Sequence, residues 1–193
     1  MVSVTDEQLI VEYLEGAQES FDLLLERYLK AIYNFIFRMI GDPKEAEDLS
    51  QETFLKVWTN LKKFKRNKRF KVWIYQIARH TTIDFIRKKK TIPFSDLSYS
   101  NDEDNEKNFE DSLKDDGFSP LENMEKLELE NTVQSVLNEL PPYYKDVIIF
   151  HYLEQLTFDE ISQITGESLN TLKSRHRRAL VVLKKKFADG KKR

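Results

Sequence analysis

The sequence lacks cysteine, which excludes disulfide bonds, thiolate catalysis and cysteine-ligated zinc. Glycine and proline are scarce, with five of each in 193 residues, whereas an all-β domain would need many more for tight turns. Its first fifteen residues lack a basic stretch followed by an apolar core, so no secretion signal is expected. The apolar run at 31–40 is interrupted by Asn34 and Arg38 and is too short to cross a bilayer. These absences favour a helical protein of the reducing cytoplasm.

Charge is distributed unevenly along the chain, although the net charge is only −2. Residues 62–90 carry twelve Lys or Arg and one acid, and residues 168–193 carry ten Lys or Arg and one acid. Between these blocks, residues 95–130 carry thirteen acids and three lysines. A single charged run usually belongs to a solvated helix face. Two basic blocks around an acidic one indicate two polyanion-binding surfaces.

Apolar periodicity and capping residues predict an all-α fold made of two small helical domains joined by a flexible acidic linker. The first domain is expected over residues 1–94, with helices at 5–14, 20–40, 43–63 and 70–90. The linker is expected over residues 95–119, which are rich in Asp, Glu, Asn and Ser. The second domain is expected over residues 120–193, with helices at 121–140, 143–153, 157–165 and 169–188.

The last two predicted helices have the spacing of a helix-turn-helix. Residues 157–160 form a capping-box sequence, Gly166 provides the turn, and Ser168 is placed to cap the basic final helix. One face of that helix is expected to be buried, with Leu172, His176, Ala179, Leu180, Leu183 and Phe187. The opposite face carries the residues expected to bind DNA: Asn170, Thr171, Lys173, Ser174, Arg175, Arg177 and Arg178. Of these, Asn170, Thr171, Ser174 and Arg175 are placed to contact base edges in a major groove.

Three stretches of this block resemble region 4 of the extracytoplasmic-function (ECF) group of sigma-70 factors. They are residues 140–147 (LPPYYKDV), 152–161 (YLEQLTFDEI) and 171–179 (TLKSRHRRA). The resemblance implies binding to the −35 promoter element and to the flap of the polymerase β subunit. Asn170, Leu172, His176 and Glu167 depart from the family pattern, which usually has Gly, Val and aliphatic residues at these positions.

An acidic helix lies at residues 42–58 (DPKEAEDLSQETFLKVW) and resembles region 2.2 of the same family. Helical spacing directs Leu49, Phe54 and Val57 to the core and leaves a polar, acidic face elsewhere. That face carries Glu45, Asp48, Gln51 and Glu52. The resemblance implies that these four residues dock on the coiled coil of the polymerase β′ subunit.

An aromatic and basic helix at residues 70–87 (FKVWIYQIARHTTIDFIR) resembles regions 2.3 and 2.4, with His80 where Asn is usual. Separated DNA strands expose bases that stack on aromatic rings, and nearby Lys and Arg hold the backbone. Ile74, Ile77 and Phe85 are expected in the core, whereas Trp73 suits either role. The candidates for binding −10 DNA are Phe64, Lys65, Arg66, Lys68, Arg69, Trp73, Arg79, His80, Arg87 and Lys88. The resemblance implies that the loop at 65–69 captures a flipped −10 base.

The chain is therefore identified as resembling an ECF sigma factor, which implies three partners: core RNA polymerase, promoter DNA and an anti-sigma factor. No cofactor, metal ion or small-molecule substrate is expected, and the location is expected to be cytoplasmic, with membrane tethering only through an anti-sigma factor. An autonomous helix-turn-helix regulator is the alternative, but it leaves the basic block at 62–90 unexplained. An enzyme such as a nuclease is disfavoured, because His80, His151 and His176 are scattered and no catalytic motif is present.

Overall fold

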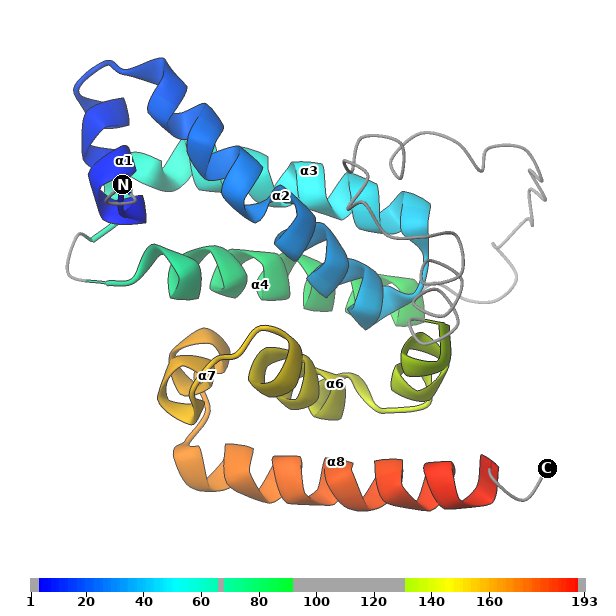
Figure 1. The fold of residues 1–193 in the computed structure, drawn as a ribbon. Coiled ribbons are helices and arrows are strands. Elements are labelled where there is room, and N and C mark those ends of the chain that lie inside the picture. Colours follow the sequence, from blue (N-terminus) through cyan, green and yellow to red (C-terminus); the bar gives the residue numbers. More distant parts are fainter. Residues whose placement is uncertain (1–3, 66–67, 92–130, 191–193) are drawn as a thin grey trace, which may run out of the picture.

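The computed structural model describes residues 4–65, 68–91 and 131–190, and all regular secondary structure among them is helical. The N-terminal unit contains α1 (Asp6–Leu14), α2 (Gln18–Ile40), α3 (Pro43–Asn60), the 3-10 turn η1 (Leu61–Lys63) and α4 (Phe70–Thr91). The C-terminal unit contains helical residues 131–138, α6 (Pro142–Ile148), the π-helical turn η4 (Ile149–Leu153), α7 (Phe158–Thr165) and α8 (Leu169–Gly190). The predicted all-α fold of two helical units is confirmed, and the predicted linker lies outside the described residues (Figure 1).

Local capping chemistry fixes the helix ends where the sequence predicts them. Thr5 and Gln8 form a capping box at the start of α1, with the Gln8 amide donating to Thr5 Oγ1 at 3.2 Å. The side chain of Asp42 accepts the Glu45 amide at 3.1 Å and begins α3. Gly41 ends α2 at φ 79°, in the left-handed region that favours glycine. Each cap satisfies a backbone group that would otherwise lack a partner.

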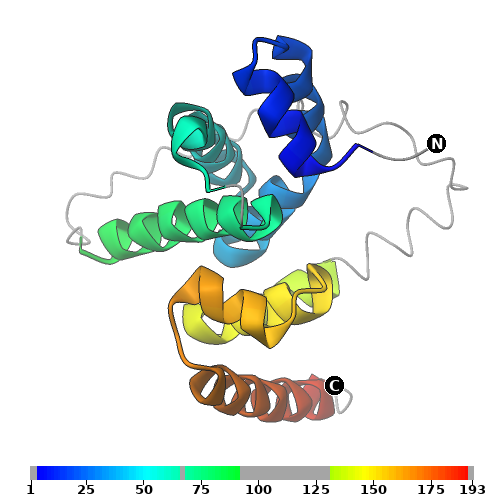
Figure 2. The same ribbon diagram turned by 90° about the vertical axis from the view of Figure 1, so that its left-hand side faces the viewer.

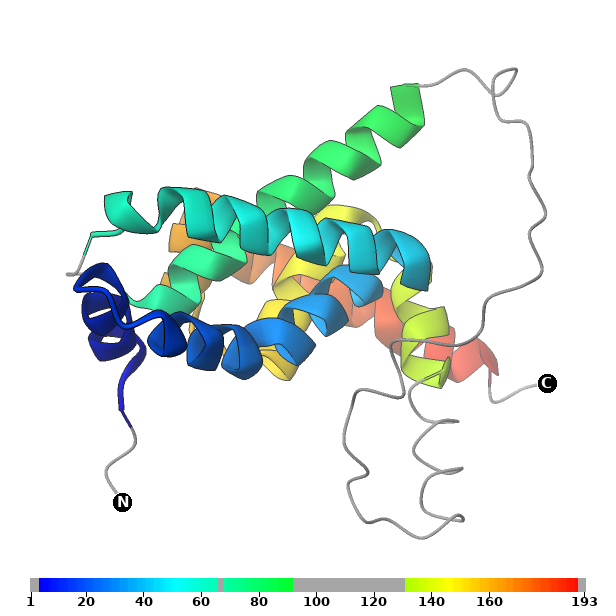
Figure 3. The same cartoon turned by 90° about the horizontal axis from the view of Figure 1, so that it is seen from above.

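The N-terminal unit is built around α2, which packs against α1, α3 and α4. Its buried apolar residues recur every three or four positions, as an amphipathic helix requires. They are Leu24, Tyr28, Ile32, Phe35, Ile36 and Met39. Seen from above, α4 crosses beneath α3, and its C-terminal half projects beyond the bundle (Figure 3).

The helix-turn-helix has the predicted caps. Thr157 and Glu160 form the capping box of α7, Gly166 turns at φ 73°, and Ser168 Oγ accepts the Thr171 amide at 3.2 Å to begin α8. Helix α8 packs through Leu172 and Ala179, which are fully buried.

The predicted buried face of α8 is wrong at Leu180, whose exposed fraction is 38%. The reason is helical rotation: each residue advances about 100°, so the neighbour of buried Ala179 points away from α6. His176 and Leu183 are half-buried, and the side chain of Phe187 lies outside the described residues.

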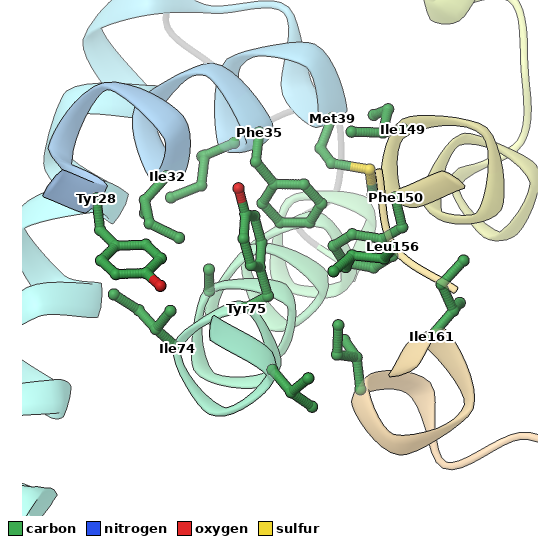
Figure 4. Packing of buried hydrophobic residues seen from close by; sticks show 14 of the residues in the cluster. Tyr28, Ile32, Phe35, Met39, Ile74, Tyr75, Ile149, Phe150, Leu156 and Ile161 are labelled. Atoms are coloured by element: carbon green, nitrogen blue, oxygen red, sulfur yellow. The ribbon is translucent and has the colours of Figure 1, made fainter. Parts of the chain in front are cut away.

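The two units share a continuous core instead of standing apart. Phe150 of η4 inserts between α2 and α4, with its ring centroid 4.8 Å from that of Phe35 and 5.8 Å from that of Tyr75 (Figure 4). Leu156 and Ile161 are buried in the same core. A fully buried Phe contributes about 1.5–3 kcal/mol, so this contact is an appreciable part of the stability of a small protein.

No helix within the described ranges is long and apolar enough to cross a membrane.

A ring cluster joins η4, α7 and α8. His151 stacks on Phe158 with a centroid distance of 4.7 Å and lies 5.3 Å from His176. The Tyr152 hydroxyl and Nε2 of His176 form a hydrogen bond at 3.0 Å. Burial, followed by the neighbouring His151, lowers the pKa of His176 below its ordinary value of 6.5. The cluster therefore favours neutral His176.

Acidification is expected to destabilise the chain through His176. Since the pKa is lower in the folded protein, the unfolded chain binds more protons as the pH falls through about 6.5, and the free energy of unfolding decreases. His176→Leu removes this contribution. Urea titrations at pH 7.5 and 5.5 should show a smaller loss of stability for the variant than for the wild type. Equal losses would contradict the assignment, and His80→Leu, at an exposed histidine of α4, is the matched control.

Candidate nucleic-acid and partner interfaces

The predicted acidic face forms part of one exposed stripe along α3. Asp48, Gln51 and Glu52 are exposed, whereas Glu45 is half-buried near the helix start. The Gln51 amide donates to Glu47 Oε1 at 3.5 Å, and Glu52 pairs with Lys56 at 2.6 Å. Both partners of that ion pair are solvated, so it contributes little to stability and leaves Glu52 available to a partner.

Two large apolar side chains continue this stripe and are absent from the predicted set. Leu55 is 58% exposed and Trp58 is 52% exposed, one and two helical turns beyond Gln51. The Trp58 indole donates to the Tyr13 hydroxyl at 2.7 Å, which holds the ring against α1. Apolar side chains gathered beside charged ones are typical of a protein-binding face. Their spacing of four and seven residues from Gln51 could have identified them.

A cleft of about 430 Å³ opens between α3, η1 and α4. It is lined by Lys56, Asn60, Lys63, Trp73, Ile77, His80 and Thr81. Two of these residues, Trp73 and His80, are predicted −10 contacts. The cleft combines a ring for stacking, an amide for hydrogen bonds and lysines for phosphate, which are the groups that bind an unstacked nucleotide.

The aromatic side chains near the cleft differ in their exposure. Trp73 is half-buried and lies 5.2 Å from Phe64 and 5.8 Å from Phe70, centroid to centroid. Phe64, Phe70 and Tyr75 are buried, so in this arrangement their rings support the core and Trp73 faces the cleft. Ile74 is buried, while Ile77 and Phe85 are partly buried against the core, as predicted.

Sequence patterns did not single out the α3 side of the cleft. Lys56 Nζ donates to Thr81 Oγ1 at 3.0 Å, which ties α3 to α4 across the cleft floor. Asn60 and Lys63 follow Lys56 at helical spacing and line the same wall. These three residues could have been found because they share one helix face, which a match to a single motif does not reveal.

The basic candidates around α4 fall into two sets. Lys65, Lys68, Arg87 and Lys88 are exposed, and Arg66 lies outside the described residues. Arg69 and Arg79 meet acids of the C-terminal unit, where the side chain of Arg69 stays 72% exposed and that of Arg79 is 13% exposed. Arg69 pairs with Glu160, and Arg79 pairs with Asp146 through Nε at 2.8 Å and the terminal guanidinium nitrogen at 2.7 Å.

Burial acts differently on the acids that face α4. Around Glu160, which holds Arg69, burial is outweighed by the hydrogen bonds from Thr157 and the nearby Arg69 and Lys71, so the pKa of Glu160 is lowered. Burial raises the pKa of Asp146 to about 6 against the opposing effect of Arg79, and Asp146 Oδ1 has no hydrogen-bond partner. Burial also raises the pKa of Glu154, which accepts a hydrogen bond from the Tyr75 hydroxyl. Burial raises the pKa of Tyr75, so the phenol stays protonated and donates.

Helix α8 is the outermost helix of the C-terminal unit, on the far side from α1–α3 (Figure 2). Its predicted DNA-binding residues are exposed at five positions: Asn170, Thr171, Lys173, Arg177 and Arg178. Ser174 and Arg175 are half-buried. The described face is therefore basic and solvent-facing, as an element that enters a major groove requires.

Arg175 has partners that the sequence did not suggest. Its guanidinium pairs with Glu167 at 2.5 Å and lies 5.3 Å from the centre of the Tyr143 ring. Glu167 replaces the usual aliphatic residue of the family pattern, so the departure supplies a charge partner. In this arrangement Arg175 binds the turn between α7 and α8. The Arg175 side chain could contact a base only after its ion pair with Glu167 is broken.

Comparisons with known proteins agree with this division of the chain. The Sigma-70 region 2 family matches residues 24–92, and the Sigma-70 region 4 family matches residues 130–183. The ECF RNA polymerase sigma factor SigW of Bacillus subtilis is 34% identical over 180 residues, covering 93% of this chain and 95% of the relative. The RNA polymerase sigma-H factor of Pseudomonas aeruginosa is 30% identical over 175 residues, covering 90% of this chain and 89% of the relative.

Solved structures share the fold. CnrH, in a complex with the cytosolic domain of CnrY, matches with a TM-score of 0.68 at 19% identity, covering 95% of this chain and 97% of that one. RpoE of Bartonella quintana, in a complex with the anti-sigma factor NepR, matches with a TM-score of 0.64 at 23% identity, covering 86% and 96%. With both sigma-70 regions in order on one helical chain, this protein belongs to the ECF group of the sigma-70 family.

Proposed function

We propose that the chain is an ECF sigma factor that brings core RNA polymerase to specific promoters and opens the DNA there. The observation that carries the proposal is the presence of three separate surfaces on one chain: the exposed stripe of α3, the cleft beside α4 and the basic face of α8. An autonomous regulator would need only the last of these. The function involves no bond chemistry of the chain itself, and its partners lie in the cytoplasm.

In this proposal the stripe of α3 docks on the β′ coiled coil. Asp48, Gln51 and Glu52 supply polar contacts, and the exposed Leu55 adds an apolar anchor. A few anchors carry most of the binding energy of an interface, while surrounding charges set orientation and association rate. The C-terminal unit is proposed to contact the β flap.

The variant Asp48→Arg/Gln51→Ala should bind core polymerase about tenfold or more weakly, because it places a like charge opposite the partner and removes a hydrogen-bonding group. The measurement is a pull-down and gel-filtration titration with purified core enzyme. Asp22→Arg/Gln18→Ala is the matched control, since it makes the same changes at exposed positions of α2. Unchanged binding by the α3 variant would contradict the proposed docking face.

The cleft is proposed to take an unstacked −10 base. Trp73 offers its ring, Asn60 and His80 offer hydrogen-bonding groups, and Lys56 and Lys63 face the phosphate. The exposed Lys65, Lys68, Arg87 and Lys88 are proposed to hold the adjacent backbone, with Arg69 and Arg79 joining them once they leave their acidic partners. Phosphate contacts position the DNA, and the cleft distinguishes bases.

Trp73→Ala should weaken promoter opening about tenfold to hundredfold, because stacking on an aromatic ring is worth roughly 1–3 kcal/mol per base. Permanganate reactivity of unpaired thymines in the holoenzyme–promoter complex measures the open fraction. Trp73→Phe retains a ring and should keep most of the opening. If Trp73→Ala binds core normally and still opens DNA like the wild type, the base does not occupy this cleft.

Helix α8 is proposed to enter the major groove of the −35 element. Asn170 and Thr171 lie at its exposed N-terminal end, where side chains reach base edges. Lys173, Arg177 and Arg178 lie on the exposed face, where they suit phosphate. Ser174 and Arg175 are kept as proposed base contacts, Arg175 after it leaves Glu167.

Arg178→Ala should weaken holoenzyme binding to different −35 sequences by similar factors and reduce the slope of log affinity against log salt by about 1.

Asn170→Ala should relax preference at one base position, at a cost of about 1–3 kcal/mol on the preferred sequence. Binding competition over a set of single-base −35 variants separates the two effects. The assignment fails if Arg178→Ala alters preference at one position while Asn170→Ala has no effect.

An anti-sigma factor is also proposed as a partner. Both fold neighbours described above were solved with a protein partner, and one of those partners is described as an anti-sigma factor. Any tethering of this chain at a membrane would then come from that partner.

A further inference from the structure

Helix α1 contacts the start of α4, although Phe70 lies 63 positions after Glu7 in the chain. The Phe70 amide donates to Glu7 Oε1 at 3.2 Å, at the end of the bundle where α1 lies and α4 begins (Figure 1). Amides in the first turn of a helix lack partners within the helix, and a carboxylate there also meets the positive end of the helix dipole. Glu7 therefore supplies, from another helix, a cap for the first turn of α4.

A second link from α1 reaches the same turn of α4 by way of α2. The Tyr28 hydroxyl donates to Asp6, and burial together with this hydrogen bond raises the pKa of Tyr28, which keeps the phenol protonated. Arg27 also donates to Asp6, at 2.5 Å, and holds the carboxylate in place. The Tyr28 ring packs edge-on against Phe70, with the centroids 5.3 Å apart. The first turn of α1 thus contacts the Phe70 backbone directly and supports the Phe70 ring through Tyr28.

Phe70 in turn supports the aromatic ring that faces the cleft. It is fully buried, and its ring centroid lies 5.8 Å from that of Trp73. Trp73 follows Phe70 by less than one helical turn, so a shift of the first turn of α4 would move the indole with it. A binding site works only while its groups are held within about 0.5 Å of their productive positions. The position of this turn therefore matters for the cleft of about 430 Å³ that Trp73 lines.

We propose that Glu7 is a positioning residue for the cleft: its carboxylate fixes the first turn of α4 and thereby holds Trp73 where an unstacked base can stack on it. The described residues that line the cleft all come from α3, η1 and α4, so Glu7 acts without touching the base. Helix α1 also precedes residues 24–92, which match the region 2 family. The inference rests on the proposed stacking of a −10 base on Trp73 and adds the residue that orients the ring.

Two substitutions separate the reach of the Glu7 side chain from its charge. Glu7→Gln removes the charge and keeps an oxygen at the same reach, so it should retain most of the promoter opening. Glu7→Asp keeps the charge but is shorter by one methylene group, which withdraws the oxygen from the Phe70 amide. It should weaken promoter opening about tenfold, in line with the loss of a hydrogen bond to a charged group. Glu15→Asp is the matched control, because it makes the same change at an exposed position next to α1.

Permanganate reactivity of the holoenzyme–promoter complex measures opening, and a gel-filtration titration measures affinity for core polymerase. Glu7→Asp should lose opening while it binds core polymerase like the control, because the docking stripe lies on α3. A general loss of structure would weaken both. Opening by Glu7→Asp at the level of the control would overturn the proposal. So would loss of opening in Glu7→Gln with full opening in Glu7→Asp, since the charge and not the cap would then matter.

The coupling between Glu7 and Trp73 is measured with the double variant Glu7→Asp/Trp73→Ala. If Glu7 acts through Trp73, the double variant should open DNA as well as Trp73→Ala alone, because the ring that Glu7 positions is already gone. Effects that multiply would show independent roles and contradict the positioning. Full opening by Trp73→Ala would contradict the proposed function of the cleft itself, whereas a loss in Trp73→Ala with none in Glu7→Asp would contradict only the role of Glu7.

Discussion

The hydrogen bond from Tyr75 to Glu154 lies where α2, α4 and the C-terminal unit meet. The Tyr75 ring is fully buried against Phe35 and Phe150, so it belongs to the core of both units. Its hydroxyl must have a partner there, since an unpaired buried hydroxyl costs about 1–3 kcal/mol. Glu154 supplies that partner from the turn that precedes α7. The need of one buried phenol for a partner therefore helps to fix the position of the C-terminal unit on α4.

Helix α4 is consequently constrained on three sides. Phe70 and Ile74 pack into the N-terminal bundle, Tyr75 and Arg79 meet the C-terminal unit, and Trp73 faces the cleft. A helix with three occupied faces has little freedom to change its sequence. This explains why a single segment carries aromatic, aliphatic and basic residues without a simple amphipathic pattern. The proposed DNA surface is what remains of α4 after its packing requirements are met.

Much of the fold could be predicted from the sequence because its signals are local. Each helix cap joins residues three positions apart, as at Thr5, Asp42, Thr157 and Ser168. Gly166 adopts the positive φ that the turn after α7 needs, which a glycine signals by itself. The docking stripe and α8 could likewise be placed by helical spacing, although the burial of Leu180 was wrong by one residue of rotation.

Contacts between distant residues could not be predicted in this way. Arg79 and Asp146 are 67 residues apart, and Arg69 and Glu160 are 91 residues apart. No periodicity links them, since the choice of partner depends on how two preformed units dock. The burial of Phe64 under Trp73 and the α3 wall of the cleft are missed for the same reason. Each residue has a reasonable local role, and only tertiary packing decides which role it fills.

The buried ion pair between the two units, Arg79 with Asp146, stabilises the contact less than its burial suggests. Apolar residues at the position of a buried ion pair are often as stabilising or more so, because desolvating two charges costs several kcal/mol. Asp146 shows that cost directly: one oxygen has no hydrogen-bond partner, and burial raises its pKa to about 6. A contact that keeps such charges contributes less to stability than apolar packing of the same volume would.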